Sequence, residues 1–344
     1  MKTSSILLLI ISTIVLVILI LLSMSTPELD YQESKNNSIV HNDIKFLKKV
    51  PKYDVDCNDH KFINLTKERD LFQNCVLADD LTELGAKKLD FQLKPELSSF
   101  YSELQPKNNV VVVFPTFTLS AYSEPGFYTF YNGKCDQEFH GILFRGEDCL
   151  TVNIKNNFEG DYNSSDTGFK ILNLLNYNFI TDIDIDKNPS ILDSYDMVIL
   201  LHNEYVTRNE FNAITSHQNV VYLYPNALYA EVSVDYEKNT ITLVRGHNYP
   251  EITIRNGFDW IHDNTHPMEY DNSCMPWYFY KIDNGLMLSC YPENILLSDA
   301  FLLKALVEIN DPRWWNVYEK IIDKNVSEEE EKLYLDFFKL VPKK

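Results

Sequence analysis

The sequence predicts a three-layer α/β domain built on a mostly parallel sheet, with antiparallel hairpins at the edges of that sheet. Unbroken apolar runs at Val110–Phe114 and Met197–Leu201 are typical of strands that helices cover on both faces. A Thr-x-x-Glu capping box opens Arg208–Ser216, which predicts a helix. The β-branched and aromatic run Val220–Tyr224 follows at once. We therefore expect a strand, helix and strand unit with a right-handed crossover and parallel strands.

An apolar segment near the N-terminus predicts a membrane anchor. Ile6–Leu22 is almost wholly apolar and, with its flanks, reaches the roughly 20 residues that a spanning helix needs. Lys2 precedes this segment and acidic residues follow it, so the positive-inside rule predicts a cytoplasmic N-terminus and an extracytoplasmic body. The alternative is a cleaved signal peptide, but the apolar run exceeds the roughly 7–15 residues usual there. We therefore expect a single-pass signal anchor at 1–25 in the cell membrane.

The rest of the chain divides into four predicted parts. Residues 26–45 are polar and aperiodic, which indicates a flexible stalk. Residues 46–109 are expected to form a small, mostly helical N-terminal cap, with a helix over Asp79–Phe91. The α/β domain is expected over 110–310. A C-terminal amphipathic helix is expected over 311–344, where a capping box precedes apolar residues on one face.

Within the α/β domain, strands and helices are expected to alternate. Pro115 ends the first strand, and the segment 121–154, rich in aromatic residues and glycine, predicts hairpins or a long crossover that forms a lid over the strand ends. The later elements are a helix at Phe169–Leu175, a strand at Phe179–Ile185, a short helix at Pro189–Leu192, an antiparallel hairpin from VSVDY and TITLVRG, a hairpin around Asn284-Gly285, and a helix at Ser298–Glu308. The two hairpins are expected at a sheet edge.

Charge and glycosylation signals bear on the partners of the protein. The net charge of −19 is spread along the chain, so we expect nucleic acid and anionic membrane surfaces to be repelled. Contact with the membrane is expected only through the N-terminal helix. Four N-x-S/T sequons fit a glycosylated exterior, although such triplets also arise by chance: Asn36, Asn64, Asn163 and Asn325.

The cysteine content predicts disulfides. The chain has six cysteines, an even number, and none has the C-x-x-C spacing of a zinc site. Neighbouring cysteines suggest the pairs Cys57 with Cys75, Cys135 with Cys149, and Cys274 with Cys290. The third pair is open, because a two-residue turn at Asn284-Gly285 places Cys290 opposite Phe279 rather than Cys274.

The candidate site is expected where the parallel strands end. Familiar signatures are absent: the sequence has no G-x-S-x-G elbow, Walker A loop, G-x-G-x-x-G or H-E-x-x-H. Polar residues follow the predicted strands instead: Thr116 after the first, His202, Glu204 and Tyr205 after the central one, and Asn226 after the next. Ligands bind beyond the carboxyl ends of the strands in open parallel sheets, so these residues predict a site in which Thr116 and Asn226 bind the ligand.

The residue types at this site suggest roles and also a simpler alternative. His202 would act as a general base, Glu204 would orient it or bind a metal ion, and Tyr205 would supply a phenolic donor or an oxygen ligand. Iron or zinc would suit such a site. The alternative is that the polar residues only cap the following helix and satisfy backbone groups.

A second histidine cluster lies in a loop-rich segment and contains His247, His262, His266, Asp263 and Glu269. A proline in this segment argues against a helix that would align the histidines, so we interpret them as exposed loop residues. The aromatic run that begins at 277 is interpreted as hairpin packing rather than as a sugar-binding platform.

The strand, the segment His202-Asn203-Glu204-Tyr205, the helix and the Asn226 strand end resemble the catalytic domain of the large subunit of N,N-dimethylformamidase. The chain is also similar to membrane-anchored proteins of ammonia-oxidising archaea. The first resemblance covers roughly 110–308 and implies a class I glutamine-amidotransferase-like, flavodoxin-like fold. In that amidohydrolase family a mononuclear iron is held by tyrosines and a glutamate, which makes Tyr205 a candidate ligand by motif position. No second tyrosine or glutamate ligand can be placed from the sequence.

Two functions remain open. Glutamine amidotransferases carry a nucleophilic cysteine after the strand that corresponds to Val220–Tyr224, whereas this chain continues with Pro225-Asn226-Ala227-Leu228, which excludes a thiol nucleophile there. The first expectation is a membrane-anchored, extracytoplasmic, non-catalytic module that binds a small molecule or an envelope component, or serves as an envelope scaffold. The alternative is a metal-assisted hydrolase of C–N bonds in small amides.

Overall fold

The computed structural model describes residues 49–82, 85–86, 88–135, 137–139, 142–144, 146–262, 274 and 277–309. These residues all belong to the unit Phe46–Lys344. The predicted anchor (1–25), stalk (26–45) and C-terminal helix (311–344) lie outside the described residues. Among the helices that are described, none is long and apolar enough to cross a membrane.

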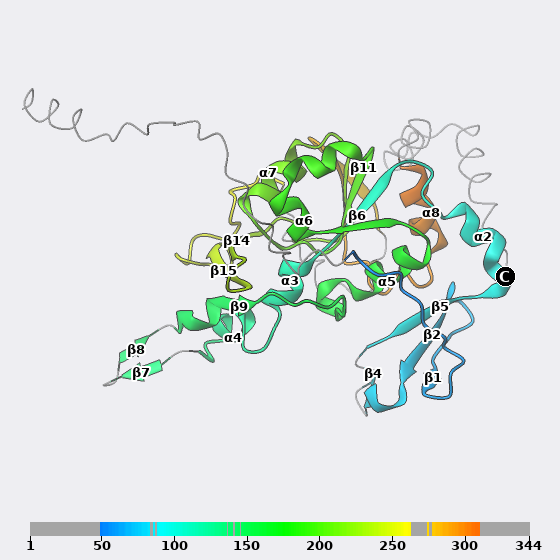
Figure 1. Ribbon diagram of the computed structural model, residues 1–344, viewed down its shortest axis with the longest axis horizontal. Helices are drawn as coiled ribbons and strands as arrows, with labels where there is room; N and C mark the ends of the chain where they lie inside the picture. Colours follow the sequence, from blue (N-terminus) through cyan, green and yellow to red (C-terminus); the bar gives the residue numbers. More distant parts are fainter. Residues whose placement is uncertain are drawn as a thin grey trace, which may run out of the picture. The chain divides into compact units, whose positions relative to one another are not determined.

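A six-stranded sheet is the central element of the described part of the chain (Figure 1). Its strands, in spatial order, are β10 (Asn178–Thr181), β6 (Val110–Phe114), β11 (Met197–Leu200), β13 (Val220–Tyr222), β17 (Gly285–Leu288) and β16 (Phe279–Ile282). Neighbouring strands from β10 to β17 are parallel, and β16 pairs antiparallel with β17 at one edge. The predicted mostly parallel sheet with an antiparallel edge hairpin is therefore confirmed, and β11 lies in its interior.

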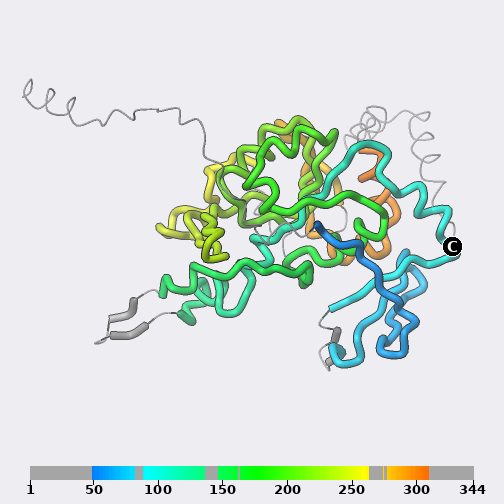
Figure 2. The backbone as a smooth tube through the Cα atoms, in the orientation of Figure 1, coloured from blue at the N-terminus to red at the C-terminus, as the bar shows by residue number. Residues whose placement is uncertain are grey.

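Different helices cover the two faces of this sheet, which gives the predicted three layers. Every residue of β6 and β11 is buried, and alternate residues of each strand join two separate apolar clusters because side chains alternate between the faces. One cluster includes apolar residues of α5 (Asp166–Leu174) and α8 (Ala300–Glu308). The other includes apolar residues of α6 (Asp182–Lys187) and α7 (Arg208–Ser216). Figure 2 follows the same segments along the backbone.

The predicted helices of the α/β domain are confirmed. Helix α7 has the predicted bounds, and the Thr207 hydroxyl at its N-cap accepts a hydrogen bond from the Glu210 backbone N at 3.1 Å. Helices α5 and α8 lie within two or three residues of their predicted starts. The short helix predicted before β11 is the 3₁₀ helix Pro189–Ser194.

The strand predicted at Phe179–Ile185 is wrong in its second half. Strand β10 ends at Thr181, whose hydroxyl caps α6 by accepting from the Asp184 backbone N at 3.3 Å. The Asp184 carboxylate accepts in return from the Thr181 backbone N at 2.8 Å. The alternating acids that suggested a strand therefore belong to the first turns of a helix, where the helix dipole favours negative charge.

The segment 46–109 is not mostly helical, so that prediction is corrected. Its described elements are β1 (Phe62–Asn64), β2 (Phe72–Leu77), β3 (Leu81–Thr82), β4 (Gly85–Ala86), β5 (Asp90–Leu93), 3₁₀ helices at Ala78–Asp80 and Pro95–Leu97, and α2 (Ser98–Glu103). Strands β1, β2 and β5 form an antiparallel sheet in that order. The Cys57–Cys75 disulfide joins two residues of this region. Phe91 of β5 is fully buried in the main apolar cluster. Pairing of β3 with β4 and of β5 with β2 thus overrides the local helical pattern of Asp79–Phe91.

The insertion after β6 combines helices with strands. Its described elements are α3 (Thr116–Ala121), α4 (Phe127–Tyr131), β7 (Gln137–Phe139), β8 (Ile142–Phe144), β9 (Thr151–Asn153), and 3₁₀ helices at Glu147–Leu150 and Tyr162–Ser164. The β7–β8 hairpin confirms the predicted hairpin, and Cys135–Cys149 joins the segments on either side of it. Strand β9 extends a second sheet that also contains β15 (Thr240–Arg245), β14 (Ala230–Asp235) and β12 (Tyr205–Val206). The antiparallel β14–β15 hairpin is the one predicted from the sequence.

The hairpin of β16 and β17 has a different register from the predicted one. Ile282 pairs with Gly285, so the turn residues are Asp283 and Asn284 rather than Asn284 and Gly285. A Cβ built at Gly285 would overlap the Val220 carbonyl of β13, which explains the glycine by close backbone approach. In this register Cys290 bonds to Cys274, and all three neighbouring cysteine pairs form disulfides. Three disulfides indicate a body that folds in an oxidising, extracytoplasmic compartment.

Candidate functional site

The backbone at the end of β11 is held in a fixed path between the two sheets. The Glu204 carbonyl accepts hydrogen bonds from the backbone N of Tyr229 and of Ala230, each at 2.9 Å. On the other side, the Thr118 hydroxyl accepts from the backbone N of Glu204 at 2.9 Å and of Tyr205 at 3.1 Å. These bonds connect the predicted motif to α3 and to the start of β14. Helix α3 and the start of β14, which are far apart in the sequence, therefore fix the backbone position of Glu204.

The Glu204 carboxylate is fully buried and is bonded by side chains rather than by backbone. One oxygen, Oε2, accepts from the Tyr122 hydroxyl at 2.9 Å, and the other, Oε1, lies 2.6 Å from His247 Nε2. The Tyr128 hydroxyl is 3.5 Å from Oε1 and 2.7 Å from the Tyr122 hydroxyl. Tyr122 and Tyr128 come from the insertion, and His247 follows β15. The insertion and the segment after β15 thus both reach the Glu204 carboxylate, which itself follows β11.

The charges of this cluster follow from its neighbours. Burial opposes ionisation of Glu204, yet the imidazoles of His247 and His202 and the Tyr122 hydroxyl hold the pKa of Glu204 below its usual value. Burial also raises the pKa of the Tyr122 phenol well above its usual value, and the nearby Glu204 charge adds to this. In the folded protein without a ligand, the ionised Glu204 therefore accepts hydrogen bonds from the neutral Tyr122 phenol and from Nε2 of the His247 ring.

His202 presents an unbonded ring nitrogen beside this carboxylate. Its Nδ1 lies 2.5 Å from the Asn163 carbonyl oxygen, which can only accept, so Nδ1 carries the proton. Burial lowers the pKa of His202, which favours the neutral ring. Nε2 is then an acceptor. Within the described residues it has no hydrogen-bond partner, and it lies 3.9 Å from Glu204 Oε2.

The structure brings together only part of the predicted site. His202 and Glu204 are neighbours, whereas the Tyr205 hydroxyl donates to the Tyr131 hydroxyl at 3.2 Å and has no described bond to Glu204. Thr116 and Asn226 are buried, and neither has a described contact with Glu204. The Asn226 side-chain oxygen has no hydrogen-bond partner among the described residues. The tyrosines at the carboxylate are therefore not the tyrosine of the motif.

The interpretation of His247 as an exposed loop histidine is wrong. Its side chain is 20 % exposed, its ring stacks on Tyr205 with centroids 5.5 Å apart, and it pairs with Glu204. The predicted hairpin could have indicated this position of His247. Antiparallel pairing brings the end of β15 to the start of β14, and β14 pairs with β12 at Tyr205. His262 instead lies 3.1 Å from the exposed Asp283 carboxylate. Asp263, His266 and Glu269 lie outside the described residues.

The donor set at Glu204 fits a metal ion only if the phenols take part. In the described part of the chain, no three His, Cys, Asp or Glu side chains are arranged to hold a metal ion. Tyr122, Tyr128 and His247 add two phenol oxygens and one nitrogen around Glu204, and a buried, unbonded nitrogen of His202 lies nearby. A mixed set of oxygen and imidazole donors suits iron.

Comparison with known proteins gives no family. No protein-family model matches the sequence, and no curated protein matches it. The chemistry of the site therefore rests on the geometry described above.

Proposed function

We propose that the extracytoplasmic body is a metal-assisted hydrolase of C–N bonds in small amides, with Glu204 at its centre. The observation that supports this is the fully buried Glu204 carboxylate, bonded by Tyr122 and His247 from two other segments. Burial of a charge costs free energy, and the hydrogen bonds from Tyr122 and His247 offset part of that cost and hold the carboxylate in one position. Capping of α7 does not require Glu204, because Thr207 is the N-cap residue.

The residues of the cluster would have distinct roles. Glu204, Tyr122, Tyr128 and His247 would hold the metal ion, with the phenols deprotonated on binding. When bound, such an ion supplies Lewis acidity to a substrate carbonyl and lowers the pKa of water. The unprotonated Nε2 of His202 would accept a proton from the attacking water, and the bond to the Asn163 carbonyl keeps that tautomer. The amide substrate class comes from the resemblance around His202 and Glu204.

A second candidate is a non-catalytic binding or envelope-scaffold module. Glu204 and Tyr205 have no exposed surface, and their bonds are made within the chain. A site closed in this way would serve stability rather than turnover.

An assay of amide hydrolysis separates the two candidates. The full chain, purified in detergent and supplied with iron or zinc, should release dimethylamine from N,N-dimethylformamide, and His202→Asn should lower the rate at least about 100-fold because the proton acceptor is lost. His217→Asn is the matched control, since His217 bonds only to neighbouring backbone groups, Tyr195 O and Asn219 N. Absence of hydrolysis of small amides by the metal-supplied wild-type chain would contradict the proposal and favour the non-catalytic module.

A further inference from the structure

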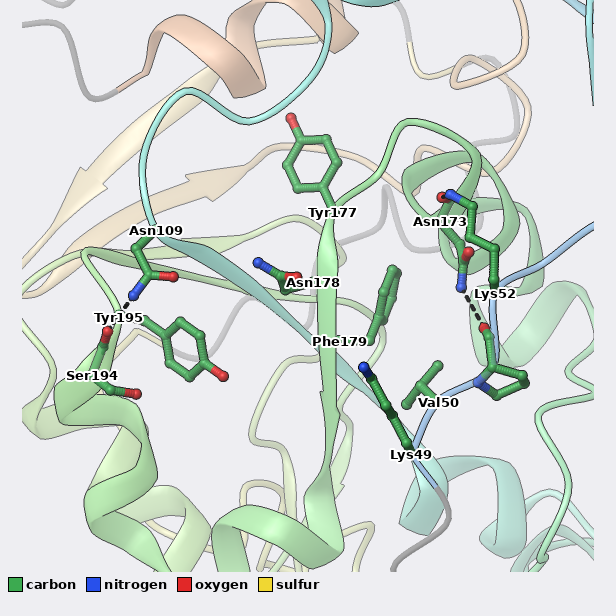
Figure 3. A pocket seen from close by; sticks show the side chains of 11 residues that line it. Lys49, Val50, Lys52, Asn109, Asn173, Tyr177, Asn178, Phe179, Ser194 and Tyr195 are labelled. Carbon is green, nitrogen blue, oxygen red and sulfur yellow. Dashed lines mark hydrogen bonds between the residues drawn. The ribbon is translucent and has the colours of Figure 1, made fainter.

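A cavity lies at the amino ends of the central strands, whereas Glu204 follows their carboxyl ends. Its volume is about 780 Å³, within the roughly 300–1,000 Å³ of small-molecule sites. Asn109 precedes β6, Asn178 begins β10, and Tyr195 lies just before β11, so the amino ends of three adjacent strands form one wall (Figure 3). This cavity shares no residue with the cluster at the carboxyl ends.

The other wall is formed by residues 49–52, and a buried amide fixes this segment in place. The Asn173 side chain, near the end of α5, donates to the Pro51 carbonyl at 2.9 Å and accepts from the Tyr53 backbone N at 2.9 Å. Asn173 is only 4 % exposed. The Lys52 ammonium donates to the Asn173 carbonyl at 2.5 Å. The two walls are therefore parts of one folded structure.

Several polar groups in the cavity are free to bond a ligand. The side chains of Lys49, Asn178 and Tyr195 form no hydrogen bond with the described residues, and Figure 3 shows Tyr195 and Asn178 on one side of β10, with Lys49 and Phe179 on the other. Phe179 and Tyr195 are half-buried and add flat apolar surface. Among the described residues that line the cavity, none is Asp or Glu, although the chain carries a net charge of −19. Lysines are the only charged side chains among those residues, so the local charge of the cavity favours an anionic ligand although the protein as a whole is acidic.

We propose that this cavity binds an acidic carbohydrate, with Lys49 pairing with the sugar carboxylate. The Asn178 amide, which offers two donors and an acceptor, would bond sugar hydroxyls, and the rings of Phe179 and Tyr195 would pack on the apolar faces of the sugar. A phosphate-rich ligand such as a nucleotide fits less well. The end of α5 that faces the cavity is its C-terminal end, where carbonyl groups carry partial negative charge and Lys52 is already bonded to one of them.

Calorimetric titration of the full chain in detergent tests this assignment. The probes are oligogalacturonate, oligomannuronate and hyaluronan fragments, with galacturonic acid monomer to distinguish a glycan chain from a free sugar acid and ADP to represent nucleotides. The methyl ester of oligogalacturonate is the uncharged control. We expect at least one acidic saccharide to bind, the ester to bind at least tenfold more weakly than its parent acid if that acid binds, and added salt to weaken binding of the acid.

Two substitutions assign the binding to this cavity. Lys49→Gln should weaken binding of the acidic saccharide at least fivefold, and Asn178→Ala should also weaken it, whereas Lys238→Gln should not. Lys238 is a suitable control because it is an exposed lysine that pairs with Asp235 elsewhere on the surface. Since Lys49 and Asn178 are exposed, both variants should fold, and an unchanged thermal midpoint checks this. No binding of any acidic saccharide, equal binding of acid and ester, tighter binding of ADP, or full affinity in Lys49→Gln would overturn the assignment.

Discussion

At Glu204, a single buried carboxylate depends on partners that lie far away in the sequence. Tyr122 precedes it by 82 residues, and His247 follows it by 43. The carboxylate keeps its charge in a buried position because these groups donate hydrogen bonds to it. Loss of a donor would leave a charge without compensation, which costs far more than loss of a pair on the surface.

His247→Ala should lower the free energy of unfolding by about 3 kcal/mol, because it leaves the buried Glu204 carboxylate without its closest partner. His262→Ala is the matched control from the same sequence segment. It should change the free energy by less than about 0.5 kcal/mol, since its partner Asp283 is largely exposed. Urea titration of the full chain with its disulfides intact measures both values. Equal effects of the two substitutions would contradict the buried-pair account.

The sequence predicted part of this site. His202 and Glu204 could be found because they follow directly on a buried strand, and parallel sheets bind ligands at that end. Tyr122 and Tyr128 could not, since nothing in the insertion distinguishes a tyrosine that reaches the carboxylate from one that packs. Tyr205 was predicted as a ligand from its place in the motif, and its hydroxyl donates to the Tyr131 hydroxyl, which the sequence did not indicate.

At the scale of elements, helices α6 and α7 meet through a pair of buried acids. Asp182 and Glu210 are fully buried, and Asp182 accepts from the Asn203 amide at 2.5 Å and from the Phe117 backbone N at 2.7 Å. Neither Glu210 carboxyl oxygen has a hydrogen-bond partner among the described residues, and two acids that are buried near one another do not both ionise readily. Burial raises the pKa of Asp182 to about 7, and burial together with the Asp182 charge raises the pKa of Glu210 well above its usual value.

Raised pKa values in the folded state make this pair stabilising at low pH. The contribution is complete below the unfolded pKa values, about 4, and is lost progressively as the pH rises from there through the folded pKa values, which are about 7 for Asp182 and well above the usual value for Glu210. Glu210→Gln mimics the protonated acid, so it should match the wild type within about 0.5 kcal/mol at pH 4 and exceed its stability by about 1 kcal/mol at pH 8. Urea titrations at both pH values measure this, with exposed Glu237→Gln as the control. A variant that is less stable than the wild type at pH 8 would refute the raised pKa of Glu210.

The edge of the sheet provides a second test at this scale. Gly285→Ala should destabilise the protein by about 3 kcal/mol, because a Cβ would overlap the Val220 carbonyl and disrupt the pairing of β13 with β17. Gly133→Ala is an informative comparison. Gly133 has a positive φ of 67° in a loop, where only the ordinary backbone cost of about 1 kcal/mol applies. A similar loss in both variants would favour the original turn interpretation of Gly285.

Elements with local signals were predicted well, and elements fixed by distant contacts were not. Helix α7 carries its own cap and apolar face, so its bounds are as predicted. The segment Asp79–Phe91 has helical spacing, but its strands are decided by pairing of β3 with β4 and of β5 with β2, which local spacing does not report. The end of β10 was missed because Thr181 reads equally well as a β-branched strand residue and as a helix cap.

For the whole molecule, three disulfides, an acidic surface and a central parallel sheet describe a body suited to the cell exterior. The two ends of that sheet have different chemistry. The carboxyl ends of its strands lead to a carboxylate, phenols and imidazoles in the interior, whereas the amino ends line an open cavity whose Lys49 and Asn178 side chains form no hydrogen bond with the described residues. The proposed hydrolase site and the proposed carbohydrate site are therefore independent and can be tested separately.

The metal content of the full chain tests the central claim most directly. After purification in detergent and reconstitution with iron, mass spectrometry should find about one iron ion per chain in the wild type and in Tyr101→Phe, whose hydroxyl bonds elsewhere to Leu71. Glu204→Gln and Tyr122→Phe should each lower the metal affinity at least tenfold, because each removes an oxygen donor. A wild-type chain that retains neither iron nor zinc, or a Glu204→Gln variant that binds metal as well as the wild type, would contradict a metal site at Glu204.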